Sequence, residues 1–139
     1  MTPGELLAEV LRAEHAAVYG YGVLGARLDD ARRRTALAAF DAHRARRDDL
    51  VGRLGAAAPA TLASYDVAVA TPDQALLLAV TIEERVGVRW LNVVAGTGDP
   101  ALRALAVGAL QETAVRAARW RRLRGGGAVT VAFPGRPGA

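Results

Sequence analysis

The chain has 139 residues, of which 52% are hydrophobic and 23% charged, and this composition is typical of a single globular domain. It contains no cysteine, which excludes disulfides, thiolate metal sites and cysteine nucleophiles, and all 18 of its basic residues are arginine, giving a formal net charge of +4. Because no uninterrupted apolar stretch reaches membrane-spanning length and the N-terminus has no secretory pattern, we expect a cytoplasmic protein with no membrane partner.

The first predicted helix covers residues 3–28. Thr2 is placed to cap it, Pro3 occupies the first helical position, and Glu5 completes a capping box. Within the helix, one stripe of residues repeats at alternating spacings of three and four and should face neighbouring helices. Glu14 lies in this stripe, so the sequence predicts an inward carboxylate. The stripe consists of Leu7, Leu11, Glu14, Val18, Tyr21, Gly25 and Leu28. His15 lies one position off the stripe and is expected at its boundary.

The second predicted helix covers residues 31–54, with Asp30 as its N-cap. The short turn before it predicts that the first two helices are antiparallel neighbours. Two ionisable residues, His43 and Arg47, fall in its inward stripe. This stripe consists of Leu37, Phe40, His43, Arg47, Leu50 and Leu54.

The third and fourth predicted helices cover residues 72–95 and 100–123, capped by Thr71 and Asp99. The segment from Gly55 to Thr71 is long enough to cross the whole bundle. The third stripe holds Leu76, Val80, Glu83, Gly87, Trp90 and Val94. The fourth holds Leu102, Leu105, Ala109, Glu112, Arg116, Trp120 and Leu123.

The chain nearly repeats itself at a spacing of 69 residues, which indicates a duplicated helical hairpin. The matched positions are start signals and charges: Thr2 to Glu5 with Thr71 to Gln74, Glu14 with Glu83, Asp30 with Asp99, Arg34 with Arg103 and Arg47 with Arg116. We therefore predict an all-α fold, an antiparallel four-helix bundle over residues 2–123 in which a long crossover joins two hairpins.

Residues 124–139 form a tail whose apolar segment, Val-Thr-Val-Ala-Phe, ends at Phe133. We expect the tail to dock on the bundle with Phe133 as its anchor. Contact with a second subunit and a frayed end are the alternatives, and the sequence leaves a homodimer open.

Each helix directs at least one ionisable side chain inward near its middle. Buried charges are costly unless they are paired or bind a cation, so these groups are expected to meet. The predicted buried polar cluster consists of Glu14, His43, Arg47, Glu83, Glu112 and Arg116.

A four-helix bundle with central carboxylates and a histidine resembles the ferritin-like superfamily over residues 2–123. The segments AEHAAVYGYGV at 13–23, AHRARRDDL at 42–50 and AFPG at 132–135 resemble, more narrowly, an uncharacterised ferritin-like family of GC-rich bacteria. The resemblance implies a di-metal site with single glutamates on two helices and a Glu-x-x-His pair on each of the others. Glu14 and Glu83 match the single glutamates. Phe40 replaces the glutamate that should precede His43, and Val115 replaces the histidine that should follow Glu112.

Two interpretations of the centre follow. In the favoured one, Arg47 and Arg116 neutralise the carboxylates, no cofactor or catalytic residue is expected, and the protein is a non-catalytic bundle with a degenerate di-metal site. In the alternative, Glu14, His43, Glu83 and Glu112 bind iron or manganese in an oxidoreductase with an atypical ligand set.

A third class, an assembly or nucleic-acid-associated protein, would use the arginine runs at 32–34, 44–47 and 119–124. The first two runs are interleaved with aspartates, and the pattern of alternating aromatic and basic residues is missing, so nucleic-acid binding is not expected. The last run has no acid near it in the sequence.

Overall fold

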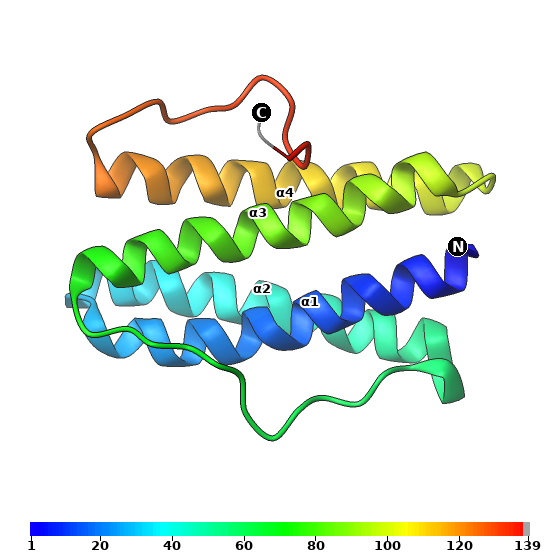
Figure 1. Ribbon diagram of the computed structural model, residues 1–139, viewed down its shortest axis with the longest axis horizontal. Helices are drawn as coiled ribbons and strands as arrows, with labels where there is room; N and C mark the ends of the chain where they lie inside the picture. The colour runs from blue at the N-terminus through cyan, green and yellow to red at the C-terminus, as the bar shows by residue number, and fades with distance from the viewer. Residues whose placement is uncertain (138–139) are drawn as a thin grey trace.

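The computed structural model describes residues 1–137 and consists of four long helices: α1 Pro3–Leu24, α2 Asp30–Leu54, α3 Pro72–Gly96 and α4 Pro100–Arg124. Two short 3-10 turns, Gly25–Arg27 and Gly55–Ala57, follow α1 and α2. The helices pack side by side as a bundle (Figure 1), and residues 1–137 contain no strand. The predicted all-α four-helix bundle is confirmed.

The linker at 58–71 runs along the length of the bundle, so α3 begins at the end where α2 also begins (Figure 1). As a result α3 is antiparallel to α1. The first hairpin consists of α1 and α2, and the second consists of α3 and α4. Two glycines let α1 and α3 approach closely. Gly20 of α1 lies against the end of the Ile82 side chain, and Gly96 of α3 lies against the end of the Leu6 side chain, so a Cβ at either glycine would require that side chain to move. None of the helices within residues 1–137 is both long and apolar enough to cross a membrane.

Three of the four predicted helix caps are present. Thr2 forms the full capping box with Glu5, and Thr71 and Asp99 each accept a backbone hydrogen bond in the first turn of their helices. The prediction for α2 was wrong by one residue. Asp29 is the N-cap, with its side chain accepting from the Arg32 N–H at 2.9 Å, and Asp30 is already helical.

Leu28 is followed directly by the capping Asp29, whereas Gly98 lies between Thr97 and the capping Asp99, and this extra residue changes the register of the repeat. An arginine in each second helix donates to two carbonyls at the end of the first helix: Arg33 to those of Gly25 and Leu28, and Arg103 to those of Val94 and Thr97. The capping aspartates and these arginines are 70 residues apart, whereas α1 and α3 match at 69. The predicted pairs Asp30 with Asp99 and Arg34 with Arg103 were therefore one residue out of step.

The spacing of 70 aligns the buried positions of α2 with those of α4. Ala36 and Ala39 correspond to Ala106 and Ala109, which are also buried, and the next two pairs are His43 with Thr113 and Leu50 with Trp120. Leu37, predicted in the inward stripe of α2, is 56% exposed. A one-residue shift turns a helical side chain by about 100°, so the inward stripes predicted for α2 and α4 were partly wrong.

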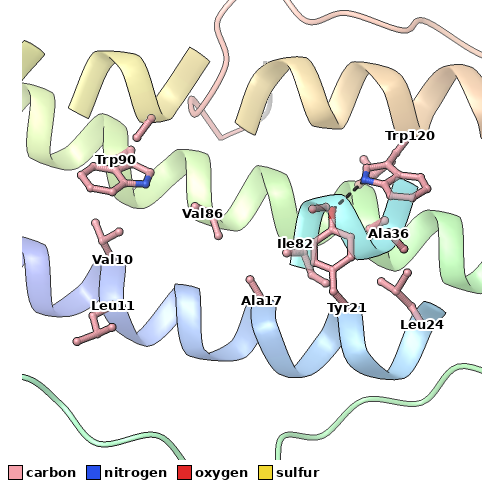
Figure 2. Close-up of a cluster of buried hydrophobic side chains, with 14 of the residues drawn as sticks. Val10, Leu11, Ala17, Tyr21, Leu24, Ala36, Ile82, Val86, Trp90 and Trp120 are labelled. Atoms are coloured by element: carbon pink, nitrogen blue, oxygen red, sulfur yellow. Dashed lines mark hydrogen bonds between the residues drawn. The ribbon is translucent and has the colours of Figure 1, made fainter. Parts of the chain in front are cut away.

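The apolar core has a tryptophan near each end (Figure 2). Trp90 packs with Val10 and Leu11 at one end, and Trp120 lies beside Tyr21 and Leu24 at the other. Smaller side chains, among them Ala17 and Val86, lie between them. The polar groups described below lie at the middle of the helices, between these two apolar ends.

Residues 128–137 form a C-terminal strap that runs back over α3 and α4 (Figure 1). The strap is held by Arg121, which donates to the Val129 carbonyl at 3.2 Å, and by Gly135, which lies against Gly87 of α3. Phe133 was predicted to be the anchor, but its side chain is 62% exposed. Glycine fits this contact because only a residue without a Cβ approaches the α3 backbone so closely. Residues 138–139 of the predicted tail lie outside the described part of the chain.

Candidate functional site

His43 of α2 bridges two carboxylates at the centre of the bundle. Its Nδ1 lies 2.5 Å from Glu14 Oε2 of α1, and its Nε2 lies 2.9 Å from Glu83 Oε1 of α3. His43 has no exposed surface, and each glutamate is 1% exposed. Because both ring nitrogens face carboxylate oxygens, the arrangement is satisfied when both nitrogens carry a proton and donate, which is the imidazolium form.

Glu83 receives further hydrogen bonds from two other helices. The Tyr21 hydroxyl donates to Oε1 at 2.6 Å, and Arg116 Nε of α4 donates to the same oxygen at 3.1 Å. Trp120 Nε1 in turn donates to the Tyr21 hydroxyl oxygen at 2.9 Å, the contact dashed in Figure 2. One carboxylate thus gathers donors from α1, α2 and α4, which fixes the four helices around it.

The two oxygens of the Glu83 carboxylate differ in the number of hydrogen bonds that they accept. Glu83 Oε2 is buried and accepts no hydrogen bond from any residue within 1–137. A buried acceptor left without a partner costs free energy comparable to a lost hydrogen bond.

Burial by itself would lower the pKa of His43, because a desolvated cation is disfavoured. Hydrogen bonds to Glu14 and Glu83, and the charges of both carboxylates, outweigh burial and raise the pKa of His43 to about 9. The ring is therefore charged at neutral pH.

The pKa of Glu83 shows the opposite balance. Burial favours the neutral acid, but the hydrogen bond and charge of His43, the charge of Arg116 and the hydrogen bond from Tyr21 together lower the pKa of Glu83. Burial and the charge of Glu83 raise the pKa of Tyr21 well above its ordinary value, so the phenol stays protonated and donating. The carboxylates of Glu14 and Glu83 thus face the positively charged side chains of His43 and Arg116. We call these four residues the ion cluster.

The structure brings together four of the six predicted cluster residues and separates the other two. Glu112 is exposed and pairs with Arg46 at 2.8 Å. Arg47 pairs with its neighbour Asp48 at 2.9 Å. Glu112 was placed inward by a register one residue out of step, and buried Thr113 occupies the inward position next to it. Arg47 lies between the buried residues His43 and Leu50 of its stripe, but its side chain is half-buried and pairs with Asp48 instead of the glutamates.

Tyr21 and Trp120 were predicted only as members of the inward stripes, but both take part in the hydrogen bonds around Glu83. The available signal was position and chemistry together. Tyr21 lies seven residues after Glu14 and shares its helix face, and a buried phenol hydroxyl normally finds a hydrogen-bond partner. His15 was expected at the boundary of the α1 stripe, and it is 8% exposed, with Nε2 3.2 Å from the Pro59 carbonyl of the linker.

Arginines of the last run are paired with acids from another helix. Arg121 pairs with Glu84 at 2.5 Å and Arg124 with Asp73 at 3.1 Å, both residues of α3. In the second run, Arg46 pairs with Glu112 and its guanidinium lies 5.6 Å from the Trp90 ring centre. The run at 119–124 has no acidic neighbour in the sequence, but in the folded chain two of its arginines are paired with acids of α3.

The chain is thus a small helical-bundle protein with a histidine held between two buried glutamates. The chain matches the family described as "Domain of unknown function (DUF4439)" over residues 7–138, and it belongs to this family. A family of unknown function was the expectation from the three sequence segments, and the match confirms it.

A solved structure is similar to this fold over nearly its whole length. It is the crystal structure of a conserved hypothetical protein, rv2844, from Mycobacterium tuberculosis, with a TM-score of 0.84 and 35% sequence identity. The alignment covers 95% of this chain and 96% of that chain. Comparison with curated proteins gives no match.

Proposed function

We propose that the chain is a non-catalytic, ferritin-like binding module whose ion cluster takes the place of a di-metal site. The observation that carries the proposal is the position of His43, with each ring nitrogen at hydrogen-bond distance from a buried carboxylate. An imidazolium with both protons engaged has no lone pair left for a metal ion.

The remaining residues support the same interpretation. Arg116 brings a fixed positive charge to Glu83, which an incoming divalent cation would have to displace. Glu112, the third carboxylate in the ligand set implied by the ferritin-like resemblance, lies on the surface with Arg46. Within residues 1–137, no group of three or more His, Asp or Glu side chains is arranged to hold a metal ion.

The ion cluster is therefore expected to hold the helices in place, and binding is expected to take place in the cavities of the bundle. Charges of the ion cluster cancel without a bound ion, and the hydrogen bonds from Tyr21 and Arg116 hold Glu83 in one orientation. Such a centre fixes the relative positions of the four helices and leaves binding to the cavities between them.

Metal analysis tests this proposal directly. The full chain, purified in the presence of excess iron or manganese and then desalted, is expected to carry far less than one metal ion per chain by mass spectrometry. A metal that binds only the folded state raises the thermal midpoint, and EDTA would lower the midpoint by removing it. Because no bound metal is expected, EDTA should leave the midpoint of this chain unchanged.

A matched pair of variants locates any metal that is found. Glu83→Gln alters the ion cluster, whereas Glu112→Gln alters a surface carboxylate of the same type. One or two tightly held ions per chain, lost in Glu83→Gln and retained in Glu112→Gln, would contradict the proposal and establish a metal centre instead.

A further inference from the structure

A cavity of about 210 Å³ lies between α3, α4 and the C-terminal strap. Most of its wall is formed by small or apolar residues, including Gly87, Ala117 and Val131. Its polar lining consists of Glu83 of the ion cluster, Thr113 of α4, Thr130 of the strap and the paired side chains of Arg121 and Glu84. The cavity therefore extends from the strap at the surface to Glu83, whose Oε1 accepts three hydrogen bonds.

Two contacts fix the strap over this cavity. Arg121 donates through Nη1 to the Val129 carbonyl and through Nη2 to Glu84, joining strap, α4 and α3. Gly135 has a φ of +83°, and a Cβ there would lie 2.8 Å from the Gly87 carbonyl oxygen. The strap reaches this position only with glycine at 135, so the cavity wall is specified by the sequence.

Two residues of the cavity wall, Glu83 and Thr113, offer oxygens that can accept a further hydrogen bond. Glu83 Oε2 is buried and has no partner among residues 1–137, although Oε1 of the same group accepts from three side chains. Thr113 already donates its hydroxyl proton to the Leu110 carbonyl at 2.8 Å, which leaves its oxygen lone pairs as acceptors. A ligand that complements these atoms carries a hydrogen-bond donor.

Charge balance selects the kind of donor. The two carboxylates of the ion cluster are already matched by His43 and Arg116. A ligand ammonium would add an unbalanced positive charge in a buried setting, whereas a hydroxyl or amide N–H satisfies Oε2 and keeps the balance.

We propose that the strap cavity binds an uncharged small molecule with an apolar body and one hydroxyl or amide group, which donates to Glu83 Oε2. The size is adequate, since an apolar cavity of about 150 Å³ in another protein binds benzene. This ligand class deepens the proposed function, because it relies on an ion cluster that is already neutral.

Three probes of similar size test the ligand class on the full chain by ligand-observed NMR and calorimetry. Benzyl alcohol is expected to bind with a Kd on the order of 1 mM. Toluene, which lacks the donor, should bind about tenfold more weakly, since a hydrogen bond to a charged acceptor contributes about that much. Benzylamine should also bind more weakly than the alcohol. Equal binding of toluene and benzyl alcohol, tighter binding of benzylamine, or no binding of the alcohol would overturn the proposal.

Substitutions in the cavity wall test its location. Ala114→Leu places a larger side chain at a lining position and should weaken benzyl alcohol binding at least about tenfold. Ala104→Leu is the control, because Ala104 is exposed on the same helix outside this wall. If Ala114→Leu binds benzyl alcohol as the wild type does, the ligand lies elsewhere and the assignment is wrong.

A second pair of variants keeps the test decisive if the larger side chain disturbs the bundle. Gly135→Ala should release the strap and weaken alcohol binding, while Gly127→Ala, at a position with open space around it, should not. Unchanged binding in Gly135→Ala would contradict the role of the strap.

The two proposals fail on different results. If the protein holds a metal ion and still binds benzyl alcohol in the strap cavity, the proposed function is wrong and the ligand site stands. If the protein is metal-free, His43 is charged and benzyl alcohol does not bind, only the proposed ligand site is wrong.

Discussion

His43→Leu should lower the free energy of unfolding at neutral pH by about 3–5 kcal/mol, the loss expected when one partner of a buried ion pair is removed. Leucine is similar in volume to histidine, so the change deletes charge with little loss of packing. Glu14 and Glu83 would then remain buried without the cation that bridges them. Urea denaturation followed by circular dichroism measures the difference.

The control for this loss is a surface carboxylate of the same helical bundle. Glu112→Gln removes one member of the exposed pair with Arg46 and should change stability by less than about 1 kcal/mol. Comparable losses in the two variants, or no loss in His43→Leu, would show that the buried charges do not support the fold.

Stability should fall by about 3 kcal/mol as the pH rises from about 6.5 to about 9. The pKa of His43 is raised from 6.5 to about 9 in the folded chain, because the hydrogen bonds and charges of the two glutamates outweigh burial. A raised pKa means that the folded state holds the proton more tightly, so the stabilisation is complete below the unfolded pKa and is lost on passing through the folded one. Denaturation midpoints measured across this range give the slope.

The same titration in His43→Leu separates this residue from other groups. The variant lacks the titrating ring, so the fall in stability between about pH 6.5 and 9 should be largely absent. Wild type and variant with the same slope in this range would assign it to other residues.

Helix positions and inward glutamates were predictable because their signals are local. Thr2, Thr71 and Asp99 are caps whose chemistry acts within one turn. Glu14 and Glu83 lie in helices that begin at these first two caps, and their stripes were counted from the correct starting point. Both are buried as predicted.

The inward positions of the second helices were harder to predict, because they depend on the length of a turn. The Thr97-Gly98-Asp99 turn has one residue more than Leu28-Asp29, and this residue sets the register of α4. The stripe predicted for α4 therefore placed Glu112 inward, one residue before the buried position. In α2 the stripe placed Arg47 inward, where it pairs with Asp48. Counting from the capping aspartates selects Thr113, which is buried.

The docking of the strap was predicted on the wrong principle. Phe133 was chosen because large apolar residues dominate burial in general. The contact with α3 instead depends on the positive φ and missing Cβ of Gly135, which permit an approach that no side chain allows. Such a requirement concerns backbone geometry, and hydrophobic patterning does not report it.

Titration of the His43 ring by nitrogen-15 NMR tests the central claim most directly. We expect both ring nitrogens to be protonated at pH 7 and to titrate with a midpoint of about 9, as befits an imidazolium held between Glu14 and Glu83. A ring that is neutral at pH 7, with one nitrogen unprotonated or bound to a metal ion, would contradict the account.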